Sequence, residues 1–111
     1  MTFLQVEETP NGLAVSGELD VHSAGVLAGR VRAMLLGDPP VTLQLDLSRL
    51  DFIDVTGVRT LYDLHFDAAA ADCALTVSNP PQQTRRIVAV LGFQDVFALS
   101  PERRLLAEPG S

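Results

Sequence analysis

Residues 41–48 read VTLQLDLS, so four aliphatic side chains alternate with four polar ones. A repeat of two is the repeat of a β-strand, and it predicts a strand with one apolar face. Strict alternation, in place of an unbroken apolar run, indicates a sheet that is not equally covered on its two faces. The next five residues, 49–53, are expected to form a short linker into a helix.

Two strands and a helix are predicted before this strand. Residues 3–7 and 13–19 are expected to form a hairpin around the turn TPNG at 9–12, because Asn-Gly tolerates positive φ. A helix is expected over 23–36, with Ser23 able to cap its start and GDPP at 37–40 ending it. Its apolar side chains recur at spacings of three and four: Leu27, Val31, Met34 and Leu35.

Two more pairs of strand and helix are predicted after residue 53. A helix is expected over 56–71, a strand over 74–78 and a second helix over 82–91, ended by Gly92. The first of these helices carries an apolar stripe of Val58, Leu61, Leu64 or His65, and Ala68. The second is expected to turn Ile87, Val90 and Leu91 inward.

The C-terminal region is predicted to hold a short strand and a last helix. The strand is expected over 96–99, the helix from Ser100-Pro101-Glu102 to about 107, and a frayed tail over 108–111. Strands that alternate with helices imply parallel crossovers. The 111 residues therefore predict a single α/β domain. Its mixed sheet has about four to five strands, an initial antiparallel hairpin followed by mainly parallel strands, flanked by about four helices.

The charge of the chain argues against nucleic-acid binding. The net charge is −6 with a pI of about 4.6, and all eight basic residues are Arg. A nucleic-acid binder needs a basic stripe, whereas Arg85–Arg86 and Arg103–Arg104 are isolated pairs that we interpret as solvated helix faces. The absence of Lys excludes a P-loop lysine and Schiff-base chemistry.

The chain is expected to be cytoplasmic. Cys73 is the only cysteine, so no intrachain disulfide can form, and its apolar neighbours predict a buried, inert thiol. The first residues show neither a signal peptide nor a membrane-spanning segment. We expect no direct membrane insertion, and a monomer or weak dimer.

The segment DVTG at 54–57 carries the most informative chemistry. Asp54 is placed to cap the N-terminus of the following helix, which puts Thr56 in the first turn at the positive end of the helix dipole. Gly57 removes side-chain bulk beside that hydroxyl. A phosphoryl group on Thr56 would face free backbone N–H groups and would add about −1.5 to −2 charges beside Asp54. Read alone, however, the segment is also compatible with simple helix capping.

Other polar residues receive ordinary structural interpretations. His22 is expected at the surface and His65 at the edge of an apolar helix face. Asp20, Asp51 and Asp54 lack the spacing of a metal-ligand cluster, so we expect no metal and no cofactor. Because no nucleophile–base pair and no cofactor motif is present, the chain is not expected to be an enzyme.

Three stretches together resemble the STAS domain family, in its anti-sigma-factor-antagonist type. GELD at 17–20 precedes the first helix, DLSRLDFIDVTGV at 46–58 resembles the phosphorylation-site region, and LGFQDVFAL at 91–99 resembles the late turn into the last strand. All three occur in the family's order and spacing, and the resemblance covers nearly the whole chain.

The resemblance implies a bacterial phosphoprotein that regulates transcription by switching partners. In such antagonists the residue before the Gly, here Thr56, receives phosphate from an anti-sigma factor that is itself a Ser/Thr kinase, and a phosphatase removes it. Phosphorylation would stop binding to the kinase. The partner surface would include Asp20, Asp54, Val55, Gly57 and Arg59, and Arg59 could pair with Asp63 one turn along the helix.

Two departures from the family pattern keep alternatives open. Many antagonists have Ser-Ser-Gly where this chain has Val55-Thr56-Gly57, and Val55 could either contact a partner or pack under the first helix, which we favour slightly. STAS domains are also accessory subunits of lipid-transporting ABC complexes, which often place a hydroxyl directly after the Asp. A stressosome-like scaffold component is a third alternative.

Overall fold

The computed structural model describes residues 3–94 and 97. Its elements follow in the order β1 (Gln5–Thr9), β2 (Gly12–Leu19), α1 (Ala24–Leu35), β3 (Thr42–Ile53), α2 (Val55–Ala70), β4 (Ala74–Ser78) and α3 (Gln82–Leu91). Three predicted segments lie outside the described residues: the strand over 96–99, apart from Phe97, the helix from Ser100 to about 107 and the tail over 108–111.

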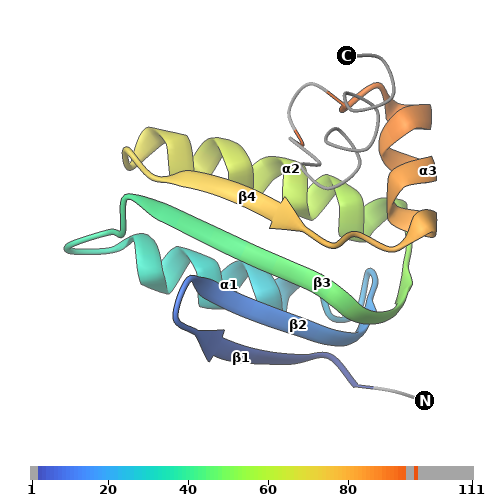
Figure 1. The fold of residues 1–111 in the computed structure, drawn as a ribbon, viewed down its shortest axis with the longest axis horizontal. Coiled ribbons are helices and arrows are strands. Elements are labelled where there is room, and N and C mark those ends of the chain that lie inside the picture. Colours follow the sequence, from blue (N-terminus) through green and yellow to red (C-terminus); the bar gives the residue numbers. More distant parts are fainter. Residues whose placement is uncertain (1–2, 95–96, 98–111) are drawn as a thin grey trace, which may run out of the picture.

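The described strands form one mixed sheet in the order β1-β2-β3-β4 (Figure 1). β1 pairs with β2 in antiparallel fashion, whereas β2 with β3 and β3 with β4 are parallel pairs. Successive right-handed crossovers that proceed in one direction across a sheet place their helices on the same face. α1 and α2 accordingly pack against each other behind the strands in Figure 1. The predicted α/β class and mixed sheet are confirmed.

The hairpin turn is found where it was predicted, but it uses Pro10-Asn11 as its two central residues. The prediction relied on positive φ at both Asn11 and Gly12. In the structure only Gly12 of these two has a positive φ. Gly12 has φ +156° and lies directly against the backbone of Gln44 in β3. A side chain there would collide with the neighbouring strand, which is why the turn ends in Gly.

β3 is longer than predicted and includes the expected linker 49–53. Its register against β2 shifts twice, so β3 carries one extra residue between Asp46 and Arg49 and another between Leu50 and Phe52. Such β-bulges break the repeat of two. The buried β3 residues are therefore Leu43, Leu45, Leu47, Leu50 and Ile53. Val41, predicted to begin the strand, precedes it and is 80 % exposed.

The core lies between the helix-covered face of the sheet and the inner faces of α1 and α2. Val58, Leu61, Leu64 and Ala68 of α2 are fully buried, and His65 lies at the edge of this stripe. Leu27 and Val31 of α1 are fully buried, and Met34 and Leu35 are partly buried against the core. Cys73 is buried as predicted.

α3 has the predicted bounds, and Ile87 and Leu91 are partly buried against the core as predicted, but the inner face differs at two positions. Thr84 and Val88 are buried, whereas Val90 is 85 % exposed, so the prediction for Val90 was wrong. Thr84 and Val88 are four residues apart and therefore lie on the same face of the helix. Because Thr84 is polar, a search for apolar side chains alone does not identify it as an inward-facing position. Gly92 ends the helix with φ +75°, as predicted.

Candidate functional site

The candidate site lies at the edge of the sheet where the parallel strands β2 and β3 end. Ligand and partner sites of α/β sheets commonly occupy this carboxyl edge. The loop 20–23 follows β2, and Asp54 with the first turn of α2 follows β3. The end of β2 and the start of α2 are joined by a hydrogen bond of 3.3 Å that Asp54 N–H donates to Leu19 O.

Asp54 is the N-cap of α2, as predicted. Its backbone is extended, with φ −118° and ψ −174°, and its carboxylate accepts a hydrogen bond of 2.9 Å from Gly57 N–H. The first helical backbone bond runs from Val58 N–H to Asp54 O at 3.1 Å. The side chain thus satisfies one of the N–H groups that a helix leaves unpaired at its start.

The first turn of α2 presents three residues in three different environments. Val55 is 47 % exposed, Thr56 is half-buried and Gly57 is buried. Successive helical residues are separated by about 100° around the axis. Because position 57 faces the sheet, position 56 lies at the boundary of the interior and position 55 faces solvent. The slightly favoured interpretation of Val55 as a packed residue was wrong.

Gly57 allows α2 to approach the end of β2. A Cβ at position 57 would lie 2.6 Å from Leu19 O, 2.8 Å from Ile53 Cγ1 and 3.0 Å from Leu19 Cγ. Ordinary contacts of this kind are 3.4–4 Å. The close approach holds the first turn, and with it Thr56, against the end of β2.

The surroundings of Thr56 suit an added anion. The first N–H groups of an α-helix have no partner within the helix, and the helix dipole is positive there. Thr56 O accepts a hydrogen bond of 2.9 Å from Thr60 Oγ1, so a second hydroxyl lies one turn further on. The carboxylate of Asp54, however, acts in the opposite direction, because its negative charge would repel an added phosphate.

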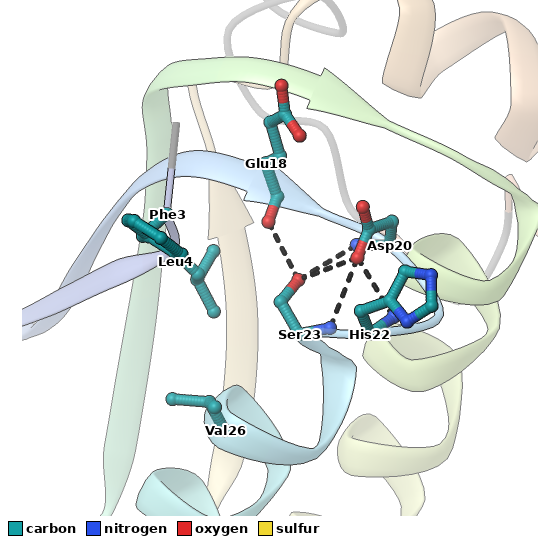
Figure 2. A pocket seen from close by; sticks show the side chains of 7 residues that line it. All are labelled: Phe3, Leu4, Glu18, Asp20, His22, Ser23 and Val26. Atoms are coloured by element: carbon teal, nitrogen blue, oxygen red, sulfur yellow. Dashed lines mark hydrogen bonds between the residues drawn. The ribbon is translucent and has the colours of Figure 1, made fainter. Parts of the chain in front are cut away.

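The neighbouring loop is held by Asp20 and Ser23, which point toward each other in Figure 2. Asp20 Oδ1 accepts hydrogen bonds from His22 N–H at 2.9 Å and Ser23 N–H at 3.1 Å, and Ser23 Oγ donates to Glu18 O at 2.7 Å. Ser23 is the N-cap of α1, but its side chain makes no cap hydrogen bond to that helix. Instead Asp20 O accepts from Ala24 N–H at 2.8 Å.

An open cavity of about 500 Å³ adjoins this loop. It lies between the segment that leads into β1 and the first turn of α1, and Figure 2 shows Phe3 and Leu4 on one side and Val26 on another. Glu18, Asp20, His22 and Ser23 line its remaining part. The sequence did not predict this cavity, because no local motif links residues 3 and 26.

Arg59 and His22 are two further residues predicted at the surface. Arg59 is exposed on α2 and does not pair with Asp63, because the ion pair found among the described residues is Arg32–Asp67. The alternative prediction, that Arg59 and Asp63 face a partner, stays open. His22 is exposed, as expected. Within residues 3–94 and 97, no three His, Cys, Asp or Glu side chains are grouped to hold a metal ion. None of the helices in that part of the chain is both long and apolar enough to cross a membrane.

Asp46 lies on the polar face of the sheet and supports the loop after β4. Partial burial acts to raise the pKa of this carboxyl, but hydrogen bonds from Ser48 N–H at 3.0 Å and Asn79 Nδ2 at 3.2 Å outweigh it. The pKa of Asp46 is therefore lowered. Asn79, which has φ +52°, is fixed by this bond in a strained turn.

Comparison with known proteins gives one family and several similar structures. A family model described as "Mlab, STAS domain" matches residues 4–105. No curated protein matches the chain. An anti-sigma factor antagonist from Mycobacterium paratuberculosis is 26 % identical, with a TM-score of 0.73 over 96 % of this chain and 93 % of that one.

Two further structures share the fold at lower identity. The anti-sigma factor antagonist SpoIIAA in its unphosphorylated form is 18 % identical, with a TM-score of 0.70 over 95 % of this chain and 94 % of that one. The STAS domain of a SulP transporter from Vibrio cholerae is 15 % identical, with a TM-score of 0.60 over 95 % and 89 %. At these identities the likeness concerns the fold alone.

Proposed function

The chain belongs to the STAS domain family, and from this membership we propose that it is an anti-sigma-factor antagonist controlled by phosphorylation of Thr56. In its unphosphorylated form it binds an anti-sigma factor that is a Ser/Thr kinase, and so regulates sigma-factor-dependent transcription. The kinase phosphorylates Thr56 and a phosphatase reverses the reaction. The chain acts as a non-enzymatic binding module.

The observation that carries this proposal is the half-buried position of Thr56 between exposed Val55 and buried Gly57. A kinase can reach a hydroxyl at this boundary, whereas one at position 57 would be inside the protein. The phosphate would then lie at the start of a 16-residue helix, where free N–H groups and the dipole favour an anion. Asp54 and Asp20 extend the charged surface that the partner meets.

The similar structures support the same class of function. The antagonist from Mycobacterium paratuberculosis is 26 % identical over almost the whole chain. Among the similar folds is also the Bacillus cell fate determinant SpoIIAA in its phosphorylated form. A phosphorylated relative of the same fold makes modification of Thr56 the natural first test.

The test is phosphorylation by purified anti-sigma-type kinases with ATP, followed by mass spectrometry to locate the phosphate. We expect a single phosphate on Thr56, none on the Thr56→Ala variant and unchanged labelling of Thr60→Ala, which removes the neighbouring hydroxyl. Thr56→Glu is expected to weaken kinase binding by about tenfold or more, because it adds charge to the contact surface. Phosphate at another residue, or full binding by Thr56→Glu, would contradict the proposal.

A second candidate is an accessory subunit of a lipid-transporting ABC complex. One observation favours it: the matching family model is described as "Mlab, STAS domain". A pull-down with the tagged chain separates the two functions. Recovery of a transporter ATPase that binds equally well to wild type and Thr56→Glu would favour the transporter role.

A further inference from the structure

We propose that two exposed valines, Val21 and Val55, form the apolar centre of the contact with the kinase, and that this centre makes phosphorylation weaken binding. The complementary kinase surface is apolar where it meets the valines and basic around them. The inference rests on the proposed function, because it concerns the partner of the same site.

The fold gives no reason for a valine at position 55. The interior of α2 is completed by Val58, Leu61 and Leu64, which are fully buried, while Val55 remains 47 % exposed. At the first position of a helix an acidic residue would gain from the dipole, whereas a β-branched residue loses side-chain freedom. Val55 thus contributes little to the core and nothing to capping.

Val21 offers a second exposed apolar group on the adjoining loop. Its side chain is 62 % exposed, and the loop that carries it is fixed by the hydrogen bonds of Asp20 to His22 and Ser23. The Asp54–Leu19 hydrogen bond of 3.3 Å joins the end of β2, directly before this loop, to the start of α2. Both valines therefore lie on hydrogen-bonded segments at the same edge of the sheet, and such preorganisation lowers the entropy cost of binding.

The charges around the valines indicate the chemistry of the partner. Asp20 and Asp54, both partly exposed, immediately precede Val21 and Val55 in the chain. The whole chain has a net charge of −6. A partner with basic groups around an apolar centre would complement this surface in charge and in polarity.

This arrangement explains the direction of the switch. A basic partner surface alone would bind the phosphorylated form more tightly, because phosphate adds negative charge. Thr56, however, directly follows Val55, so its phosphate would have to be desolvated within an apolar contact and beside the carboxylate of Asp54. The desolvation of the phosphate and its repulsion by the carboxylate of Asp54 both disfavour binding.

The experiment measures the dissociation constant of the kinase that phosphorylates the wild-type chain, with a non-hydrolysable ATP analogue present. Val21→Ser and Val55→Ser are each expected to weaken binding about five- to tenfold, as expected when roughly half of a valine side chain is no longer buried. The matched control is Val41→Ser, which changes an 80 % exposed valine at the opposite end of β3. It is expected to change affinity by less than about twofold. Far-UV circular dichroism checks that all variants fold.

A second measurement tests the direction of the switch itself. The ratio of the affinities of the unphosphorylated and phosphorylated chains is expected to fall about tenfold when both valines are replaced, because only the unphosphorylated chain makes the full apolar contact and so only its binding is weakened. If the valine variants bind as the wild type does, or if the ratio is unchanged, the inference is wrong while the proposed function stands. If no anti-sigma-type kinase binds or phosphorylates the wild-type chain, the proposed function fails and the inference fails with it.

Discussion

The substitution Gly57→Ala tests whether the site depends on the close approach of α2 to β2. In most helices this change is stabilising by about 0.8–1 kcal/mol, because alanine is the better helix former. Here the new Cβ would lie 2.6 Å from the backbone oxygen of Leu19 and 2.8 Å from Ile53 Cγ1. To restore an ordinary contact of 3.4 Å, the first turn must move by about 0.8 Å away from a strand that cannot yield.

The expected result is a net loss of stability. Forcing one methyl group into a packed site costs roughly 1–3 kcal/mol or more, and here the movement also strains the Asp54–Leu19 hydrogen bond. When the gain in helix propensity is subtracted from this cost, we expect Gly57→Ala to lower the free energy of unfolding by about 1–2 kcal/mol. For a domain of this size that corresponds to a decrease in Tm of about 4–16 °C.

The assay is urea unfolding followed by far-UV circular dichroism, with Gly29→Ala as the matched control. Gly29 also lies within a helix, but a Cβ there would meet nothing within 4 Å. Gly29→Ala is therefore expected to stabilise the protein by about 1 kcal/mol. If Gly57→Ala stabilised the protein as much as Gly29→Ala does, the close approach of α2 to Leu19 would be refuted.

Three further predictions concern single side chains. Asp54→Ala is expected to lower the free energy of unfolding by about 1 kcal/mol through loss of the cap, and Asp54→Asn to restore most of it, both measured in urea. Because the pKa of Asp46 is lowered in the folded state, its ionised form stabilises the fold above the unfolded pKa, and this stability is lost as the pH falls through the folded pKa. Asp46→Asn should therefore flatten the decline in stability from about pH 5 downward, measured by urea unfolding at a series of pH values; an unchanged slope would contradict this. Val88→Ala is expected to cost about 2 kcal/mol and Val90→Ala less than about 0.5 kcal/mol in the same assay, and the reverse order would contradict the observed face of α3.

Most of the fold was predictable because local patterns and tertiary burial agree. The alternation over 42–48, the N-cap of α2, the C-cap of α3 and the bounds of β4 all follow from short-range chemistry that the folded chain retains. The inner face of α3 was predicted only in part. Ile87 and Leu91 are packed against the core as predicted, but Thr84 is buried although it is polar and Val90 is exposed although it is apolar, so hydrophobic spacing alone did not define the face.

The extent of β3 could not be predicted from alternation. If the repeat of two continued from Leu47, Arg49 and Asp51 would face the core and Leu50 would face away. The two bulges turn both charged residues out and Leu50 in. Bulges depend on pairing with β2, a contact about 30 residues away in sequence, so a local pattern indicates a linker instead.

The candidate site was partly predictable, because capping and a first-turn hydroxyl are local features. What the sequence did not decide was which way Val55 faces, since that depends on the angle at which α2 leaves the sheet. The nearness of the loop 20–23 is likewise a consequence of parallel pairing between β2 and β3.

The number of bulges determines which residue of the first turn is accessible. One extra residue reverses which side chains of a strand face inward, and a second extra residue restores the original order. Ile53 therefore points inward at the end of β3, as it would without bulges. With Ile53 inside and Asp54 capping the helix, the third helical residue must face the sheet, and only glycine fits against Leu19 there. Thr56 is then about 100° away, at the boundary, and Val55 about 200° away, in solvent. The half-buried position of Thr56, the residue proposed to accept phosphate, is thus set by strand pairing before Asp54 and by helix geometry after it.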